Sequence, residues 1–199
     1  MKLILLRHGR TIANERHQYL GSTDQPVTAD SLELLIRKRR EGCYPDPSGY
    51  KVYTSGMRRA EDTLRAVYGN PAHEILPGMR EIDFGSFECR TYEELKDTET
   101  YQAWLSDFEN TAPPSGESYR EMKERVLKTL QLLIDKDEDA ILVTHGGPIA
   151  AIMTTLFPEE NRNFYEWNPR HGEGFLLCFT DGKARSYAPI GAEKSSKSC

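Results

Sequence analysis

Two segments far apart in the chain each end a short apolar run in histidine and glycine. The first reads LILLRHG over residues 3–9, and the second reads AILVTHG over residues 140–146. Such an apolar run is typical of a strand buried on both faces of a parallel sheet, and glycine permits a sharp turn after it. Ligand sites in α/β folds lie beyond the carboxyl ends of the strands. We therefore expect His8 and His145 to face one crevice.

Strand and helix patterns alternate between these two runs. YKVYTS has the composition of a short strand, and SYREMKERVLKTLQLLID opens with a capping box and has an apolar stripe at helical spacing. GFLLCF and ARSYAPI flank TDGK, in which Asp-Gly is a hairpin signal. This alternation predicts a three-layer α/β fold with a mostly parallel central sheet, helices on both faces and a small inserted helical and loop cap.

The residue composition of the chain changes in its middle and at its end. Residues 84–116 are aromatic, acidic and irregular, and we expect them to form the cap over the core. Residues 1–190 are expected to form one domain that includes this cap. The polar tail, residues 191–199, is predicted to be disordered.

Composition narrows the classes of partner. The net charge of −5 argues against nucleic acid, which requires a basic face. The four cysteines lack metal-ligand spacing and are interpreted as reduced thiols. No apolar stretch approaches the ~20 residues of a membrane span, and the run at residues 3–6 is too short for a signal peptide. We expect a cytoplasmic protein that binds neither nucleic acid nor membrane.

The residue types around the two histidines indicate an anionic ligand. A neutral histidine can act as a nucleophile, and the adjacent Arg7 suits bidentate contact with a phosphate. TSGMRRAEDT again places arginines just after a strand, and the helix after His145 offers its N-terminal amides to an anion. Two histidines and two or more arginines around one point suggest a phosphoryl group.

These motifs together resemble the histidine phosphatase superfamily. The resemblance is carried, in order, by LRHGRTIAN, GSTDQP, SGMRRAEDT, REIDFG, PSGES and VTHGG, from Lys2 to about Phe179. The superfamily includes phosphoglycerate mutases, α-ribazole phosphatases and fructose-bisphosphate phosphatases. RHG alone is a weak signal, whereas the full ordered set is specific.

The resemblance implies a role for each matching residue. In the superfamily the histidine of RHG becomes phosphorylated, which corresponds to His8, and its neighbour Arg7 binds phosphate. The arginine of S-x-x-x-R-A-x-x-T corresponds to Arg59, with the adjacent Arg58 as second choice. The histidine of THGG corresponds to His145, which holds the phosphoryl group in the transition state.

The resemblance also supplies the remaining contacts and the proton donor. Asn14 and the backbone of Gly146 are expected to bind the phosphate. Glu81 of REIDFG corresponds to the proton donor and ranks above Asp83. An alkoxide leaving group needs such a donor, and the same carboxylate can then activate water. This chemistry requires no metal, and we expect neither a metal nor another cofactor.

Some residues depart from the superfamily pattern or have no assigned role. Arg10 stands where glutamate is frequent in the superfamily, and Gln18 replaces an arginine. These two departures affect contacts at the rim of the site, so the resemblance does not identify the substrate. Asp83 and Glu117 are also left open. A second RHG at residues 170–172 follows no apolar strand, so His171 is not expected to be the nucleophile, although it could line the rim with Trp167.

The activity expected is hydrolysis of a phosphomonoester on a small phosphorylated metabolite, with α-ribazole phosphate as one candidate. The chain is more compact than the cofactor-dependent mutases of the superfamily. A phosphoglycerate mutase and a non-catalytic phosphoryl-binding protein are the alternatives. The physiological substrate, the pathway and the oligomeric state are left open.

Overall fold

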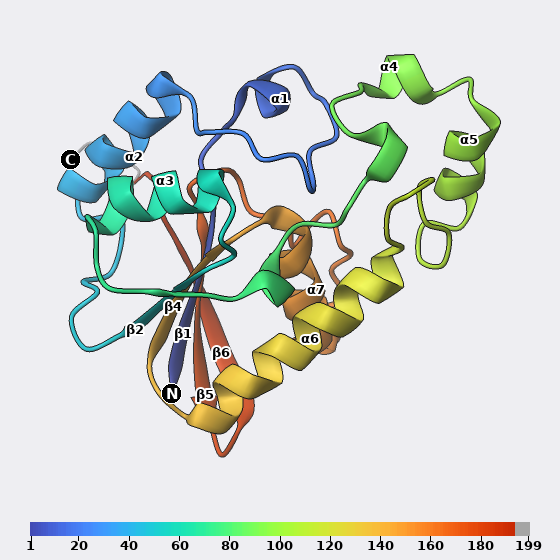
Figure 1. The fold of residues 1–199 in the computed structure, drawn as a ribbon. Helices are drawn as coiled ribbons and strands as arrows, with labels where there is room; N and C mark the ends of the chain where they lie inside the picture. Colours follow the sequence, from blue (N-terminus) through green and yellow to red (C-terminus); the bar gives the residue numbers. More distant parts are fainter. Residues whose placement is uncertain (194–199) are drawn as a thin grey trace, which may run out of the picture.

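A six-stranded sheet forms the centre of the molecule in the computed structural model, which describes residues 1–193 (Figure 1). The strand order is β3-β2-β4-β1-β5-β6. The first four strands in this order pair in parallel. β5 pairs antiparallel with both of its neighbours, β1 and β6. The predicted mostly parallel sheet is therefore confirmed. The strands are β1 (Lys2–Arg7), β2 (Lys51–Thr54), β3 (Glu74–Ile75), β4 (Ala140–Thr144), β5 (Gly174–Thr180) and β6 (Lys183–Ile190).

The pairing of β1 with β4 positions the two histidines. The register matches Arg7 with Thr144, and the amide of His8 donates to the carbonyl of Thr144 at 3.0 Å. Parallel neighbours run in the same direction, and this register pairs the last residues of the two strands, so both strands end at the same level of the sheet. His8 and His145 therefore leave the sheet side by side.

Helices cover both faces of the sheet, as predicted. One face packs against α6 (Tyr119–Lys136) and α7 (Gly146–Leu156), in one core cluster with Leu3 and Leu5. The other packs against α2 (Ala29–Arg40) and α3 (Arg58–Tyr68), in a second cluster with Ile4 and Leu6. Successive side chains of a strand point to opposite faces, so β1 is apolar throughout because both of its faces are covered.

Local sequence explains the start and the orientation of α6. Ser118 and Glu121 form the expected capping box, in which each side chain accepts from the other residue's backbone amide. Met122, Val126 and Leu130 are buried at helical spacing. This face fixes the rotation of the helix and thereby the direction in which its polar residues point.

Two stretches differ from what their residue patterns predict. IANERHQY predicts a helix over residues 12–19, but only α1 (Ile12–Glu15) forms, and His17 then adopts the left-handed conformation with φ 54°. The charged run IRKRRE predicts a solvated helix face, but in α2 Lys38 is buried and lies 3.4 Å from the carboxylate of Glu173.

The cap is present over the expected segment and lies apart from the sheet (Figure 1). It contains a 3-10 turn (Gly85–Phe87), α4 (Tyr92–Leu95) and α5 (Glu99–Ser106). Its small core consists of Phe87, Leu95, Tyr101 and Trp104. Further 3-10 turns are Pro77–Met79 and Pro158–Glu160.

The remaining expectations concern the tail and the membrane. Of the tail predicted to be disordered, residues 194–199 lie outside the described residues. Within residues 1–193, every helix is too short or too polar to cross a membrane.

Candidate active site

His8 is buried directly after β1, with only 3% of its surface exposed. Its Nδ1 lies 2.6 Å from the carbonyl oxygen of Gly9. A carbonyl only accepts, so Nδ1 carries the proton and Nε2 keeps a free lone pair. Burial, followed by the neighbouring His145 and Arg59, lowers the pKa of His8 well below its usual value. The imidazole is therefore neutral near pH 7, as a nucleophile must be.

His145 lies against His8, with 5.1 Å between the ring centroids. Arg59 Nε donates to His145 Nδ1 at 3.2 Å, so His145 Nε2 carries the proton and donates to Ser55 Oγ at 2.8 Å. Burial and then Arg59 and Arg7 lower the pKa of His145 well below its usual value. Both nitrogens have protein partners, so direct contact with a phosphoryl group requires the exchange of one of these bonds.

Arg59 is fully buried in the first turn of α3. Besides His145, it donates to the carbonyl oxygens of Gly21 at 2.6 Å and Thr23 at 2.9 Å. These partners are dipoles rather than carboxylates, and burial as the leading cause lowers the pKa of Arg59. Arg59 thus contributes a desolvated positive charge behind the two imidazoles.

Arg7 contributes the second guanidinium. Its Nη1 donates to Asn168 Oδ1 and to the carbonyl of Pro169, each at 2.7 Å. Its Nε is buried and has no hydrogen-bond partner among the described residues. An unpaired buried donor is costly, and an anion bound beside it would satisfy it. Arg7 therefore supports the expectation of an anionic ligand.

Asn14 lies in α1, and Gly146 is the first residue of α7. Asn14 Oδ1 accepts from the amide and the hydroxyl of Thr11, both at 3.0 Å, which leaves its Nδ2 hydrogens for another acceptor. Gly146 begins α7, and a Cβ there would lie 2.3 Å from Asn168 Oδ1 and 3.0 Å from Arg7 Cζ. A side chain here would displace Asn168 and crowd Arg7, so glycine keeps the present positions of both.

Glu81 approaches the same point from the segment before the cap. Its Oε2 accepts from the amide of Gly147 at 3.2 Å, and its Oε1 accepts from the amide of Ile82 at 3.1 Å. A Cβ on Gly147 would lie 2.2 Å from Glu81 Oε1. The second glycine of THGG therefore makes room for the predicted proton donor.

A cavity of about 310 Å³ opens above these groups. Arg7, Asn14, Glu81, Gly147 and Asn168 line its polar end. His8, His145 and Arg59 are not on the cavity surface and lie behind it. The other lining residues are mostly apolar or aromatic: Gln18, Tyr19, Leu20, Ile82, Phe84, Trp104, Leu105, Phe108, Tyr119, Met122, Phe164 and Tyr165.

Sequence reasoning undervalued His171. Its ring centroid lies 5.1 Å from that of His8, and its Nδ1 lies 3.1 Å from the carbonyl oxygen of His8. Burial and then Arg7 lower its pKa to about 3. His171 thus packs on the predicted nucleophile as a neutral ring. Trp167 does not line the rim, since it is fully buried.

Three further residues were missed. Ser55 begins the S-x-x-x-R pattern, and Gly147 completes THGG, so motif position could have indicated both. Asn168 lies in a loop 161 residues from Arg7 and carries no sequence signal.

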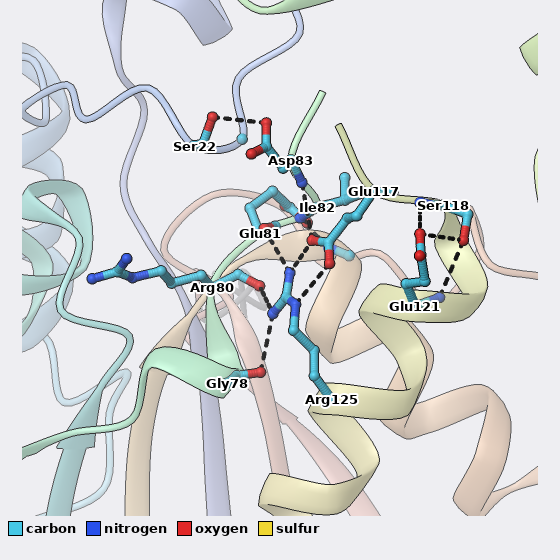
Figure 2. Close-up of polar contacts among 12 residues, drawn as sticks. Ser22, Gly78, Arg80, Glu81, Ile82, Asp83, Glu117, Ser118, Glu121 and Arg125 are labelled. Atoms are coloured by element: carbon cyan, nitrogen blue, oxygen red, sulfur yellow. Dashed lines mark hydrogen bonds and ion pairs between the residues drawn. The ribbon is translucent and has the colours of Figure 1, made fainter. Parts of the chain in front are cut away.

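The residues left open fall outside the cavity. Asp83 Oδ1 accepts from Ser22 Oγ at 2.8 Å and from the amide of Gly85 at 2.9 Å, as a turn residue does (Figure 2). Glu117 pairs with Arg125, and Arg10 is exposed. None of the three lines the cavity above His8.

The fold and site define an α/β protein that places a neutral histidine beside two desolvated guanidinium groups, an arrangement suited to a phosphoryl group. The chain belongs to the histidine phosphatase superfamily (branch 1), whose sequence profile matches residues 3–187.

Individual relatives agree with this assignment. The chain is 29% identical to the adenosylcobalamin/α-ribazole phosphatase of Salmonella typhimurium over 92% of this chain and 93% of that protein. It is similar in structure to the α-ribazole phosphatase of Shigella flexneri, with TM-score 0.84 and 27% identity over 96% of each chain. The phosphoglycerate mutase of Thermus thermophilus gives TM-score 0.75 and 27% identity over 97% of this chain and 100% of that one.

Proposed function

We propose that the protein is a phosphomonoesterase that hydrolyses a small phosphorylated metabolite through a phosphohistidine at His8. The observation that carries the proposal is the tautomer of His8: the Gly9 carbonyl holds the proton on Nδ1, and the lowered pKa keeps Nε2 unprotonated. Arg59 and Arg7 lie close enough to lower the pKa of His8, and Arg7 and Glu81 line the same cavity.

In the first step, His8 Nε2 attacks the phosphorus and the bond from phosphorus to the ester oxygen breaks. Protonated Glu81 gives its proton to the leaving oxygen, so a neutral alcohol departs. Charge spreads over the equatorial oxygens in such a transition state, and preorganised cations stabilise it. Arg7 and Arg59 supply these cations, and Asn14 and the Gly146 amide supply hydrogen bonds.

In the second step, the Glu81 carboxylate takes a proton from water as the water oxygen attacks the phosphorus. The bond from phosphorus to His8 Nε2 breaks, inorganic phosphate leaves, and His8 returns to its starting tautomer. One carboxyl group thus serves as acid and then as base. The steps use only side chains and one backbone amide of this chain and require no metal.

The walls of the cavity suit an apolar or aromatic leaving group. Among the described residues that line it, Arg7 is the only cation, and the outer wall is aromatic. A flat ring system can stack there. α-Ribazole phosphate, the ester of a benzimidazole riboside, is one candidate, and two relatives are named α-ribazole phosphatases.

A phosphoglycerate mutase is the second candidate, since one structural relative carries that name. Phosphoglycerate bears a carboxylate beside its phosphoryl group, and within residues 1–193 the lining of the cavity offers it no cation besides Arg7. The hydrolase is therefore favoured.

Incubation with p-nitrophenyl phosphate and, separately, with 3-phosphoglycerate tests the proposal. We expect phosphate release from the aryl ester and no isomerised phosphoglycerate, with activity unaffected by a chelator. Isomerised product would favour the mutase. Failure to release phosphate at any pH from 5 to 8 by a folded protein would favour a phosphoryl-binding protein.

A further inference from the structure

One arginine on α6 binds the backbone of the segment that carries Glu81 (Figure 2). Arg125 Nη1 donates to the carbonyl oxygens of Gly78 at 3.0 Å and Arg80 at 2.8 Å. Arg125 Nη2 donates to the carbonyl oxygen of Glu81 itself at 2.9 Å. A planar guanidinium with five donors can hold several acceptors at once in a fixed geometry.

Glu117 completes this arrangement from the other side. Its Oε2 accepts a hydrogen bond from Arg125 Nε at 3.0 Å, and its Oε1 accepts one from Arg125 Nη2. Its Oε1 also accepts from the amide of Asp83 at 3.0 Å, and its own amide donates to the Asp83 carbonyl at 3.0 Å. The backbone is thus held on both sides of Glu81.

The segment depends on such contacts because its backbone is irregular. Residues 80–84 belong to no helix or strand, so no ladder of hydrogen bonds fixes their path. The Glu81 carboxylate must nevertheless meet the Gly147 amide, which is fixed at the start of α7. A displacement of about 1 Å in a catalytic group can cost roughly 100-fold in rate.

Arg125 does not touch the cavity. It is absent from the lining of the cavity above His8, and its guanidinium lies on the far side of the Glu81 backbone. Its charge also contributes to the lowered pKa of His145, so its effect on Glu81 is tested with a substitution that keeps the charge.

We propose that Arg125, oriented by Glu117, is the positioning residue for Glu81, because their contacts fix the backbone of residues 78–83 against α6. The inference rests on the proposed function, in which Glu81 protonates the leaving group. It assigns α6 a part in catalysis beyond packing against the sheet.

Leaving-group dependence separates this role from a merely structural one. Phenyl phosphate and p-nitrophenyl phosphate have similar shapes, but phenoxide is the poorer leaving group and needs protonation more. Arg125→Lys keeps the positive charge and loses the planar fork. We expect kcat/KM for phenyl phosphate, which reports the phosphorylation of His8, to fall roughly tenfold more than kcat/KM for p-nitrophenyl phosphate.

A matched control lies on the same helix. Arg120→Lys makes the same chemical change at an exposed position, and we expect both rates to stay at the wild-type level. Glu117→Gln removes the charge that pairs with Arg125 and changes the shape of the side chain little. We expect it also to lower the rate on phenyl phosphate more than the rate on p-nitrophenyl phosphate, but by a smaller factor than Arg125→Lys. It also keeps the inference testable where Arg125→Lys fails to fold.

A double-mutant comparison provides the decisive outcome. In the Glu81→Gln background, Arg125→Lys should cause no further loss that depends on the leaving group, because the group it positions no longer donates a proton. Equal losses on both esters in folded Arg125→Lys and Glu117→Gln, or additive losses in the double variant, would overturn the inference. If the wild-type protein hydrolyses neither ester, the proposed function itself fails.

Discussion

At the residue scale, the proposed chemistry depends on the proton position of each imidazole. The Gly9 carbonyl holds the His8 proton on Nδ1, whereas Arg59 forces the His145 proton onto Nε2. The two adjacent rings therefore have opposite tautomers. Sequence alone places the histidines at strand ends, but the tautomers follow from partners that only the fold brings close.

Replacement of the nucleophile should separate activity from folding. His8→Ala should abolish turnover of p-nitrophenyl phosphate and leave the fold intact, because the side chain's hydrogen bond reaches only its neighbour Gly9. Loss of packing should cost about 1–3 kcal/mol in unfolding free energy. Circular dichroism and phosphate release measure the two effects. His17→Ala, at an exposed histidine, should keep full activity; substantial turnover by His8→Ala would refute the assignment.

Replacement of the proton donor should depend on the substrate. Glu81→Gln should lower kcat/KM roughly 100-fold or more for phenyl phosphate, and much less for p-nitrophenyl phosphate, whose leaving group is stable without a proton. Steady-state rates on both esters provide the measurement. Losses of the same size on both would show that Glu81 is not the acid.

At the element scale, helix termini do much of the positioning. α7 begins with Gly146 and Gly147, where side chains would strike Asn168 and Glu81. These two positions at the first turn of α7 thus leave space for Asn168 and Glu81. The start of α6 is instead a stabilising cap.

The cap of α6 can be tested by stability alone. Ser118→Ala should lower the unfolding free energy by about 1 kcal/mol, because it removes the side-chain acceptor for the Glu121 amide. Chemical denaturation measures the change. Thr28 precedes α2 at the equivalent position but makes no capping bond, so Thr28→Ala should cost less. A cost for Thr28→Ala equal to that for Ser118→Ala would contradict this reading of the cap.

At the scale of the whole molecule, the fold gathers three histidines from three parts of the chain. His8, His145 and His171 all have lowered pKa values in the folded protein, mainly through burial, that of His171 reaching about 3. The unfolded chain keeps histidine near its ordinary pKa of about 6.5. Below that pH the unfolded chain binds more protons, so stability falls as the pH falls.

This linkage predicts the pH dependence of stability. Between pH 6.5 and 5, the unfolding free energy should fall as the pH is lowered, with each of the three histidines contributing at most about 1.4 kcal/mol per pH unit. Urea denaturation at several pH values measures the slope. His171→Gln should make the slope shallower, because it removes one of the three histidines whose pKa is lowered on folding. Equal slopes for wild type and His171→Gln would exclude His171 from the effect.

The sequence by itself determined those features of this protein that depend on residues close together in the chain. Apolar runs that end in His-Gly set the strands of the sheet and the place of His8 and His145, and the ordered motifs set the superfamily. The capping box of α6 and the Asp-Gly hairpin between β5 and β6 also follow from neighbouring residues.

Only the tertiary structure decided how distant ordinary residues serve the site. His171 packs on His8 across 163 positions, and Arg125 binds the Gly78 carbonyl across 47. From the sequence alone, an arginine on a helix or a histidine in a loop is expected to be a solvent-exposed surface residue. Its role depends on which backbone groups the packing of sheet and helices leaves within reach, and that packing is set by the whole core.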